Sequence, residues 1–89
     1  MVSRKVEIKN KTGLHARPAS DFVLTAKRFE SRVTICKEGG QPVNAKSMMR
    51  LLAECIGQGT VIELSTEGPD EEQALETLIQ MIESGFGEG

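Results

Sequence analysis

The chain has 89 residues, 38% of them hydrophobic and 27% charged, and its net charge of −2 comes from a mixture of acidic and basic side chains. This length predicts a single domain over residues 1–89 with a modest core, and the near-neutral charge without Trp or Tyr argues against a nucleic-acid binder. No apolar run reaches the roughly 20 residues that cross a bilayer, and the charged N-terminus lacks the apolar stretch of a signal peptide, so we expect a cytoplasmic protein without membrane insertion.

Residues 6–30 predict a strand followed by a helix. Residues 6–9 alternate apolar with charged side chains, as a half-buried strand does, and residues 10–13 are polar and end in Gly, which is typical of a turn. Pro18 is favoured in the first turn of a helix, so we expect the helix to begin near Ala16. The apolar residues of this helix recur at three- and four-residue steps and would share one face: Ala19, Phe22, Val23, Ala26 and Phe29.

The middle of the chain predicts a hairpin and a short helix. Residues 32–37 alternate and are rich in β-branched side chains, and residues 38–41 contain the Gly-Gly of a hairpin turn. Residues 42–45 form a short strand whose proline confines it to an edge or to the strand start. Ser47 is expected to cap a helix that contains Met48, Met49, Leu51 and Leu52.

A strand and a helix complete the chain. Residues 57–59 should end the short helix, and residues 60–66 alternate as a fourth strand does. Asp70 and Gln73 resemble a capping box for the last helix, and Gly85 should end it. The apolar stripe of this helix is Ala74, Leu75, Leu78, Ile79 and Ile82. These elements predict an α+β fold, with a four-stranded, mainly antiparallel sheet covered by helices on one side.

His15 lies directly before the first predicted helix. The free N–H groups and the dipole of a helix start favour phosphate, and Arg17 adds a guanidinium whose donors match phosphoryl oxygens. A neutral imidazole nitrogen is a good nucleophile near pH 7, whereas a lone His is otherwise most often a surface or capping residue. The chain has no nucleotide-type phosphate loop and no carboxylate cluster for Mg²⁺, so the pattern predicts a phosphoryl acceptor without a cofactor rather than a self-sufficient kinase.

The two cysteines do not indicate a metal site. Cys36 and Cys55 lack CxxC spacing and, with only one His in the chain, make a poor ligand set, so we expect no metal. We interpret both as reduced thiols that pack within the fold.

Residues 11–19 (Lys-Thr-Gly-Leu-His-Ala-Arg-Pro-Ala) resemble the active-site signature of HPr, the histidine-containing phosphocarrier of the bacterial phosphoenolpyruvate:sugar phosphotransferase system (PTS). The resemblance continues through residues 44–47, residues 57–61 and the acidic final helix, and so covers essentially the whole chain. It implies an open-faced β-sandwich with three helices and the strand order 1-4-2-3.

The resemblance also implies roles for individual residues. His15 would accept phosphate on Nδ1 from phosphorylated enzyme I, which phosphoenolpyruvate charges, and would pass it to the IIA domains of sugar permeases. Arg17 would assist the transfer, and Thr12, Ala16 and Arg17 would bind the phosphate. The first two helices would form the docking face for partners, through Ser20, Met48, Met49 and Leu52. A carrier that must expose its site to successive partners is expected to be a monomer.

Ser47 is a candidate regulatory site as well as a helix cap. In many Gram-positive HPr proteins the matching serine is phosphorylated by HPr kinase/phosphorylase, and the modified form binds a catabolite-control regulator. A phosphate on Ser47 would suit a helix N-terminus and would add about −1.5 to −2 charge. The chain has Met48-Met49-Arg50 where those relatives commonly have Ile-Met-Gly, and Arg50 is closer to the enteric type, in which the serine is not a kinase target.

Three other functions remain open. A purely regulatory module would act through Ser47 alone, but the presence of His15 and Arg17 argues against it. A relative that serves nitrogen-linked phosphotransfer or dihydroxyacetone phosphorylation would use the same site chemistry and differ in its docking surface. A nucleic-acid binder is disfavoured by the charge balance and the low aromatic content.

Overall fold

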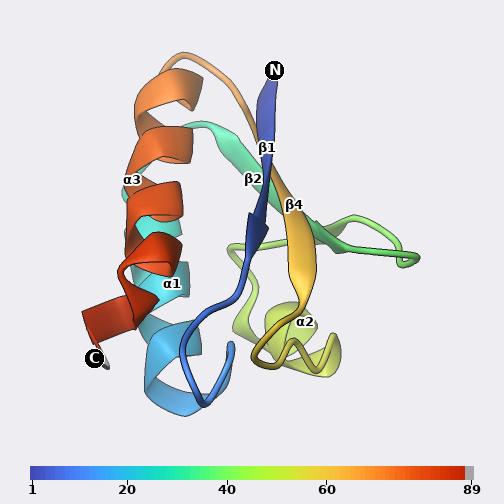
Figure 1. Ribbon diagram of the computed structural model, residues 1–89. Helices are drawn as coiled ribbons and strands as arrows, with labels where there is room; N and C mark the ends of the chain where they lie inside the picture. Colours follow the sequence, from blue (N-terminus) through green and yellow to red (C-terminus); the bar gives the residue numbers. More distant parts are fainter. Residues whose placement is uncertain (88–89) are drawn as a thin grey trace.

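A computed structural model describes residues 1–87 as a four-stranded antiparallel sheet with three helices on one face (Figure 1). The strands are β1 (Val2–Glu7), β2 (Arg32–Lys37), β3 (Val43–Asn44) and β4 (Val61–Glu67). The helices are α1 (Ala16–Ala26), α2 (Met48–Ala53) and α3 (Glu71–Glu83), followed by the short 3₁₀ helix η1 (Gly85–Gly87). The strand order β1-β4-β2-β3 confirms the predicted fold class and the topology that the HPr resemblance implied.

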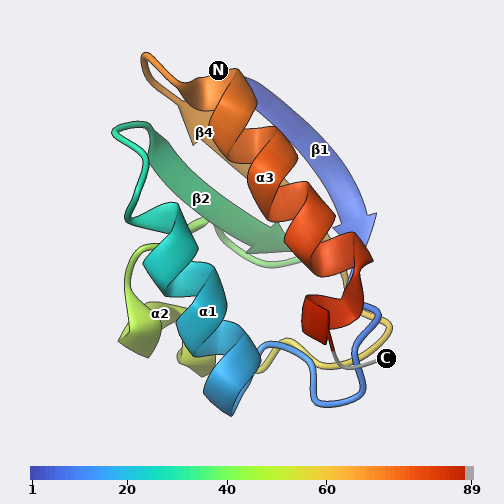
Figure 2. The same ribbon diagram turned by 90° about the vertical axis from the view of Figure 1, so that its left-hand side faces the viewer.

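The sheet buries one face because β2 and β4 alternate in the predicted way. The first strand differs from the prediction: it covers Val2–Glu7 rather than residues 6–9, and Val6 is its one buried residue. In β4, which lies between β1 and β2, the side chains of Ile62 and Leu64 are buried while those of Val61 and Glu63 are exposed. Ile62 pairs with Val6 of β1, so apolar residues of neighbouring strands meet on the same face. Figure 2 shows α1 and α3 side by side over this face, with α2 beside α1.

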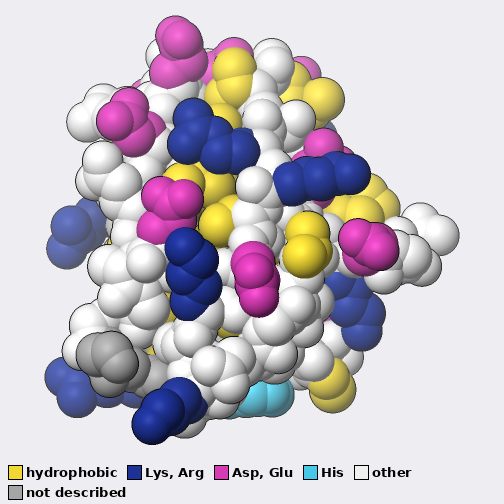
Figure 3. Space-filling model, viewed as in Figure 1, with side chains coloured by type: hydrophobic (Ala, Val, Ile, Leu, Met, Phe, Trp, Pro, Cys, Tyr) yellow, Lys and Arg dark blue, Asp and Glu magenta, His cyan; other side chains and the backbone are white. Residues whose placement is uncertain are grey.

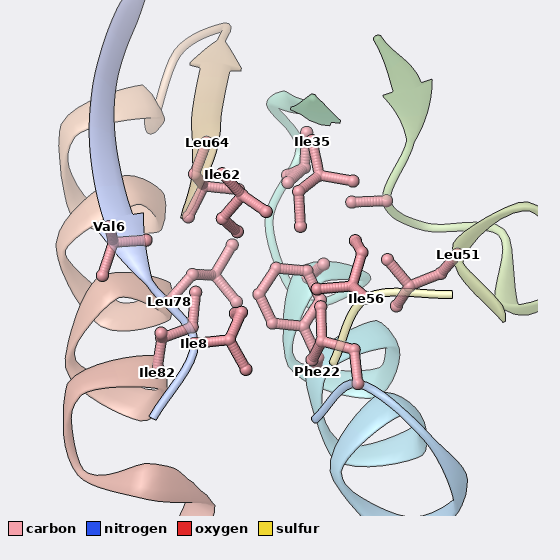
Figure 4. Packing of buried hydrophobic residues seen from close by; sticks show 14 of the residues in the cluster. Val6, Ile8, Phe22, Ile35, Leu51, Ile56, Ile62, Leu64, Leu78 and Ile82 are labelled. Atoms are coloured by element: carbon pink, nitrogen blue, oxygen red, sulfur yellow. The ribbon is translucent and has the colours of Figure 1, made fainter. Parts of the chain in front are cut away.

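The core lies between the sheet and the helices (Figure 4). Phe22 of α1 is fully buried, and it lies among side chains from the sheet, from the helices and from the loops that connect them. The other labelled side chains around it are Val6, Ile8, Ile35, Leu51, Ile56, Ile62, Leu64, Leu78 and Ile82. Full burial of a side chain of this size contributes about 1.5–3 kcal/mol, so these few residues supply a large share of the stability of so short a chain.

The two long helices match their predicted apolar stripes. The stripe of α3 is buried along its whole length, and Gly85, with a φ of +67°, follows the C-cap residue Ser84 as a helix-ending glycine does. In α1 the stripe is buried as far as Ala26, where the helix ends, so that Phe29 lies beyond the helix and is only half-buried. Within residues 1–87, no helix has both the length and the apolar composition needed to span a bilayer.

The capping box predicted at Asp70 is wrong. Asp70 is the N-cap residue of α3, but its side chain makes no capping hydrogen bond. Its carboxylate instead accepts hydrogen bonds from the backbone N–H of Glu30 (3.0 Å) and of Ser31 (2.9 Å) and from the Ser31 hydroxyl. The Glu71 side chain accepts a hydrogen bond from the Gly68 backbone N–H at 3.1 Å. Asp70 therefore joins the start of α3 to the turn before β2, because buried Ser31 needs a partner that the local helix pattern does not reveal.

The prediction that both cysteines pack within the fold is wrong for Cys55. Both thiols are free, and Cys36 is half-buried, but Cys55 is exposed. Cys55 follows Glu54, the C-cap residue of α2, and has a φ of +53°. A residue in this left-handed position ends the helix at the surface, where its side chain gains little burial.

Candidate functional site

His15 is the N-cap residue of α1, as the sequence predicted. Its backbone is extended, with φ −130° and ψ 158°, and its side chain is exposed and makes no capping hydrogen bond. In Figure 3 the histidine, the only one in the chain, lies at the lower edge of the molecule. The imidazole is therefore open to a second protein and is not used to hold the helix.

The first turn of α1 provides a positive environment next to this ring. The backbone N–H groups of a first turn have no partners within the helix, and α1 has no acidic residue in its first turn to compensate them. Arg17 is exposed in the same turn, and its guanidinium makes no ion pair with a carboxylate of residues 1–87. An anion bound beside His15 would thus lie near amide donors, with an unneutralised guanidinium in the same helical turn.

Ala16, the first residue of α1, has a φ of +48°. This is the left-handed region, which a residue with a Cβ adopts at a cost of about 1–2 kcal/mol. The chain thus changes direction sharply between the extended His15 and the helix. The unusual backbone lies directly beside the candidate phosphoryl acceptor.

Leu14 anchors the loop that carries His15. Its side chain is fully buried, and its backbone N–H donates a 2.8 Å hydrogen bond to the carbonyl of Ile56, in the segment after α2. The turn predicted at residues 10–13 is confirmed by a 3.1 Å bond from the Gly13 N–H to the Asn10 carbonyl. Gly13 has a φ of +67° and packs closely on the same segment: a Cβ built there would lie 2.5 Å from the Ile56 carbonyl oxygen.

The chain's C-terminal turn borders the site on a side that the sequence did not indicate. The ring of Phe86 in η1 meets the ring of Phe22 edge-on, with centroids 6.5 Å apart. Phe86 and Gly87 enclose, together with Arg17, Pro18 and Asp21, a hollow of about 270 Å³. The sequence could have indicated this contact, because an aromatic residue directly after a helix-ending Gly, here Phe86 after Gly85, can fold back onto the core.

The predicted phosphate-binding residues lie at the start of α1, whereas Ser47 lies at the start of α2. Thr12 is exposed in the turn before His15, and its Oγ1 accepts a 3.3 Å hydrogen bond from the Asn10 side chain. Ala16 and Arg17 begin α1. Ser47 instead caps α2, as predicted, and its Oγ accepts a hydrogen bond from the Arg50 backbone N–H at 3.3 Å.

The predicted docking residues differ in exposure. Met49 is 82% exposed, whereas Met48 and Leu52 are half-buried against the core and Leu51 is fully buried. Ser20, on α1, is half-buried, and α1 and α2 pack against each other. The sequence analysis missed Leu24 of α1, which is 60% exposed. The sequence could have indicated this exposure, because Leu24 lies outside the apolar stripe of α1 and shares a helix face with Arg17 and Ser20.

Comparison with known proteins identifies the family. Residues 2–84 match the family model PTS-HPr, described as the PTS HPr component phosphorylation site. This chain belongs to the HPr family. Among curated HPr-family relatives, the HPr-like protein Crh of Halalkalibacterium halodurans is 54% identical over 83 residues, covering 93% of this chain and 98% of that protein. The phosphocarrier protein HPr of Neisseria meningitidis serogroup A is 45% identical over 89 residues, covering 100% and 99%.

Solved HPr structures have the same fold. The crystal structure of HPr-C-His from Thermoanaerobacter tengcongensis superposes with a TM-score of 0.96 at 50% identity, covering 100% of this chain and 99% of that one. The HPr of Bacillus anthracis gives a TM-score of 0.87 at 44% identity, covering 91% and 95%. As a member of the HPr family, the chain is a phosphocarrier of the PTS, a system of sugar transport that works through a phosphohistidine.

Proposed function

We propose that His15 is the phosphohistidine, which accepts a phosphoryl group on Nδ1 from phosphorylated enzyme I and passes it to the IIA domains of sugar permeases. The observation that carries this proposal is an exposed imidazole at the N-terminus of α1, with Arg17 in the first turn and no carboxylate there. Enzyme I and the IIA domains are the partners that PTS membership suggests, and the transfers would take place in the cytoplasm.

The transfer needs little from this chain beyond position and charge. The lone pair of the His15 Nδ1 attacks the phosphorus, a nitrogen–phosphorus bond forms, and the donor keeps the electron pair of the bond that breaks. The first-turn amides of α1 and the Arg17 guanidinium then face the transferred dianion and stabilise it. Since phosphoryl transfer depends mostly on positioning and charge stabilisation, the partner proteins can supply the rest of the catalysis.

The docking face in this proposal is the surface shared by α1 and α2. Met49 and Leu24 are large apolar side chains exposed to solvent, and the half-buried Ser20, Met48 and Leu52 belong to the same two helices. Flexible methionines suit a surface that must fit several partners in turn. Complementation of sugar uptake in a strain without its own HPr would separate the sugar branch from a nitrogen or dihydroxyacetone branch.

Labelling with phosphoenolpyruvate tests the proposal. The protein is mixed with enzyme I and labelled phosphoenolpyruvate, and the product is expected to be acid-labile and base-stable, with the label mapped to His15. His15→Ala should abolish labelling, while Glu76→Ala, a change at an exposed residue of α3, should leave it intact. Labelling of His15→Ala to the wild-type extent would refute the assignment.

Ser47 is a second proposed site of phosphorylation, with HPr kinase/phosphorylase as the kinase and a catabolite-control regulator as the partner of the modified form. The 54% identity to a Crh protein favours this, since a Bacillus subtilis relative is described as catabolite repression HPr. Ser47 Oγ already accepts a bond from the α2 N-terminus, where phosphate oxygens would be favoured. Incubation with the kinase and ATP should label wild type and not Ser47→Ala; an unlabelled wild type removes the proposal.

The proposed carrier acts as a monomer, because its site must meet successive partners. Two relatives have been described as dimers, the HPr of Thermoanaerobacter tengcongensis and the Crh of Bacillus subtilis, the latter with domain swapping. Light scattering behind a sizing column should give the mass of one chain at micromolar concentration. A concentration-independent mass of two chains would contradict the monomer.

A further inference from the structure

We propose that Asn10 is a positioning residue for phosphoryl transfer, which fixes the loop before His15 in place. This inference rests on the proposed function of His15. Asn10 lies in the loop between β1 and α1 and is only 4% exposed, although it is polar. It carries no group that reacts with phosphate, so its contribution would be geometric.

Asn10 holds Gly13 from both sides. The side-chain Nδ2 donates a buried 2.8 Å hydrogen bond to the Gly13 carbonyl, while the Asn10 carbonyl accepts a 3.1 Å bond from the Gly13 N–H. The same Nδ2 donates to Thr12 Oγ1 at 3.3 Å. One side chain and its own backbone thus close a turn whose last residue is two positions from His15.

The constraint at Gly13 is transmitted directly to His15. Leu14, the single residue between them, is fully buried and bonded to the Ile56 carbonyl, so it does not allow the loop to swing. Gly13 itself lies against Ile56 and Gly57 with no room for a side chain. A chain held at Asn10, Gly13 and Leu14 presents the imidazole at a defined position relative to the start of α1.

The two ends of the Asn10 amide differ: Nδ2 makes both of its side-chain hydrogen bonds to the loop before His15. The Oδ1 is buried without a hydrogen-bond partner among residues 1–87, which is an unfavourable arrangement for a carbonyl oxygen. Leucine has nearly the same shape and would avoid that unpaired oxygen. Leucine cannot donate to the Gly13 carbonyl, however, so a comparison of asparagine with leucine isolates the hydrogen bond that holds the loop.

Asn10→Leu should therefore separate transfer rate from stability. We expect its rate of labelling by enzyme I and phosphoenolpyruvate to fall about tenfold, because ångström-scale misplacement of a reacting group can cost as much as a hundredfold. Its midpoint of urea unfolding should stay near that of wild type, since one unpaired oxygen replaces another. Backbone amide exchange at Gly13 and Leu14 should become faster.

Thr66→Val is the matched control. Thr66 is a buried polar residue of β4 whose hydroxyl donates a 2.7 Å bond to the Glu71 carbonyl, at the end of β4 that pairs with Val2. This variant should lose stability and keep the wild-type labelling rate. Asn10→Ala, which should slow labelling in the same way, replaces Asn10→Leu if the latter does not fold.

Three outcomes would overturn the inference. The inference is refuted if a folded Asn10 variant is labelled at the wild-type rate. It is also refuted if Asn10→Leu loses no more labelling rate than Thr66→Val does for the same loss of stability. If the wild-type protein itself is not labelled, the proposed function of His15 fails. Amide exchange then tests separately whether Asn10 holds the loop: unchanged protection of the Gly13 and Leu14 amides in Asn10→Leu refutes the positioning role.

Discussion

Gly13 occupies a position where a side chain does not fit. Its φ of +67° is left-handed, and a Cβ there would lie 2.5 Å from the Ile56 carbonyl oxygen and 2.6 Å from the Gly57 Cα, both of them backbone atoms. Backbone can give way only by moving the loop or the segment after α2. The residue two positions before His15 is therefore constrained by packing as well as by conformation.

Gly13→Ala should lower the free energy of unfolding by about 2–4 kcal/mol, from the left-handed conformation and the overlap together. Gly59→Ala is the control, because Gly59 also has a positive φ, +88°, but no atom within 4 Å of a built Cβ. That variant should lose only about 1 kcal/mol. Urea unfolding measures both, and equal losses would show that the close approach to Ile56 has no energetic weight.

Ala16→Gly should raise the free energy of unfolding by roughly 0.5–1 kcal/mol. Ala16 has a φ of +48°, which glycine adopts without the cost that a Cβ imposes. Ala53→Gly, at the end of α2 with ordinary helical geometry, should instead destabilise by a similar amount. The comparison is again by urea unfolding, and a loss of stability in Ala16→Gly would show that this backbone is not strained.

At the scale of the elements, Asp70 connects the start of α3 to the turn before β2. The Ser31 hydroxyl is the main cause that lowers the pKa of Asp70 below its ordinary 3.8; partial burial raises it, and the N–H groups of Glu30 and Ser31 lower it further. Because the carboxylate is favoured in the folded protein, its stabilisation is fully present above pH 3.8 and is lost as the pH falls through the lowered pKa.

Asp70→Asn should therefore weaken the acid sensitivity of the fold. The urea midpoint of wild type should fall between about pH 5 and pH 2, and the fall should be shallower in the variant, which is already less stable at pH 7. Glu76→Gln, an exposed change on α3, should keep the wild-type slope. Parallel slopes for wild type and Asp70→Asn would mean that Asp70 does not carry this pH dependence.

The helices and strands could be predicted where burial repeats along the chain. The stripes of α1 and α3 and the alternation of β4 each follow from a single element facing a single core, so local spacing was sufficient. Asp70 could not be predicted in the same way, because its partner Ser31 lies far away in the sequence and outcompetes the local capping box. The strand order likewise came from the family resemblance rather than from spacing.

Some residues of the candidate site could likewise be predicted from local sequence, whereas others could be found only in the folded structure. His15 and Arg17 could be singled out because they carry reactive and charged groups at a predicted helix start. Asn10 could not, because an amide in a polar turn predicts exposure, and only the folded chain shows it buried. The exposure of Met49 beside buried Leu51 also needed the structure, since a helix as short as α2 gives too few turns to define its inner face.

At the scale of the whole molecule, stability depends on a small core. A chain of this length is stable by about 4–13 kcal/mol, and truncation of a buried Phe to Ala costs about 3–5 kcal/mol. Phe22→Ala should therefore remove a large fraction of the total and lower the melting temperature strongly. Phe29→Ala, at a half-buried ring, should lower it much less, and similar losses measured by calorimetry would contradict the central place of Phe22.

The hydrogen bond from Leu14 to Ile56 joins an early part of the chain to one that leaves the ribosome much later. A nascent or partly folded polypeptide would contain His15, the proposed phosphohistidine, but not the segment after α2 that holds its loop. If enzyme I is the donor, as proposed, it should discriminate between folded and partly folded copies, and the extent of labelling in a mixed sample would measure the fraction of native molecules.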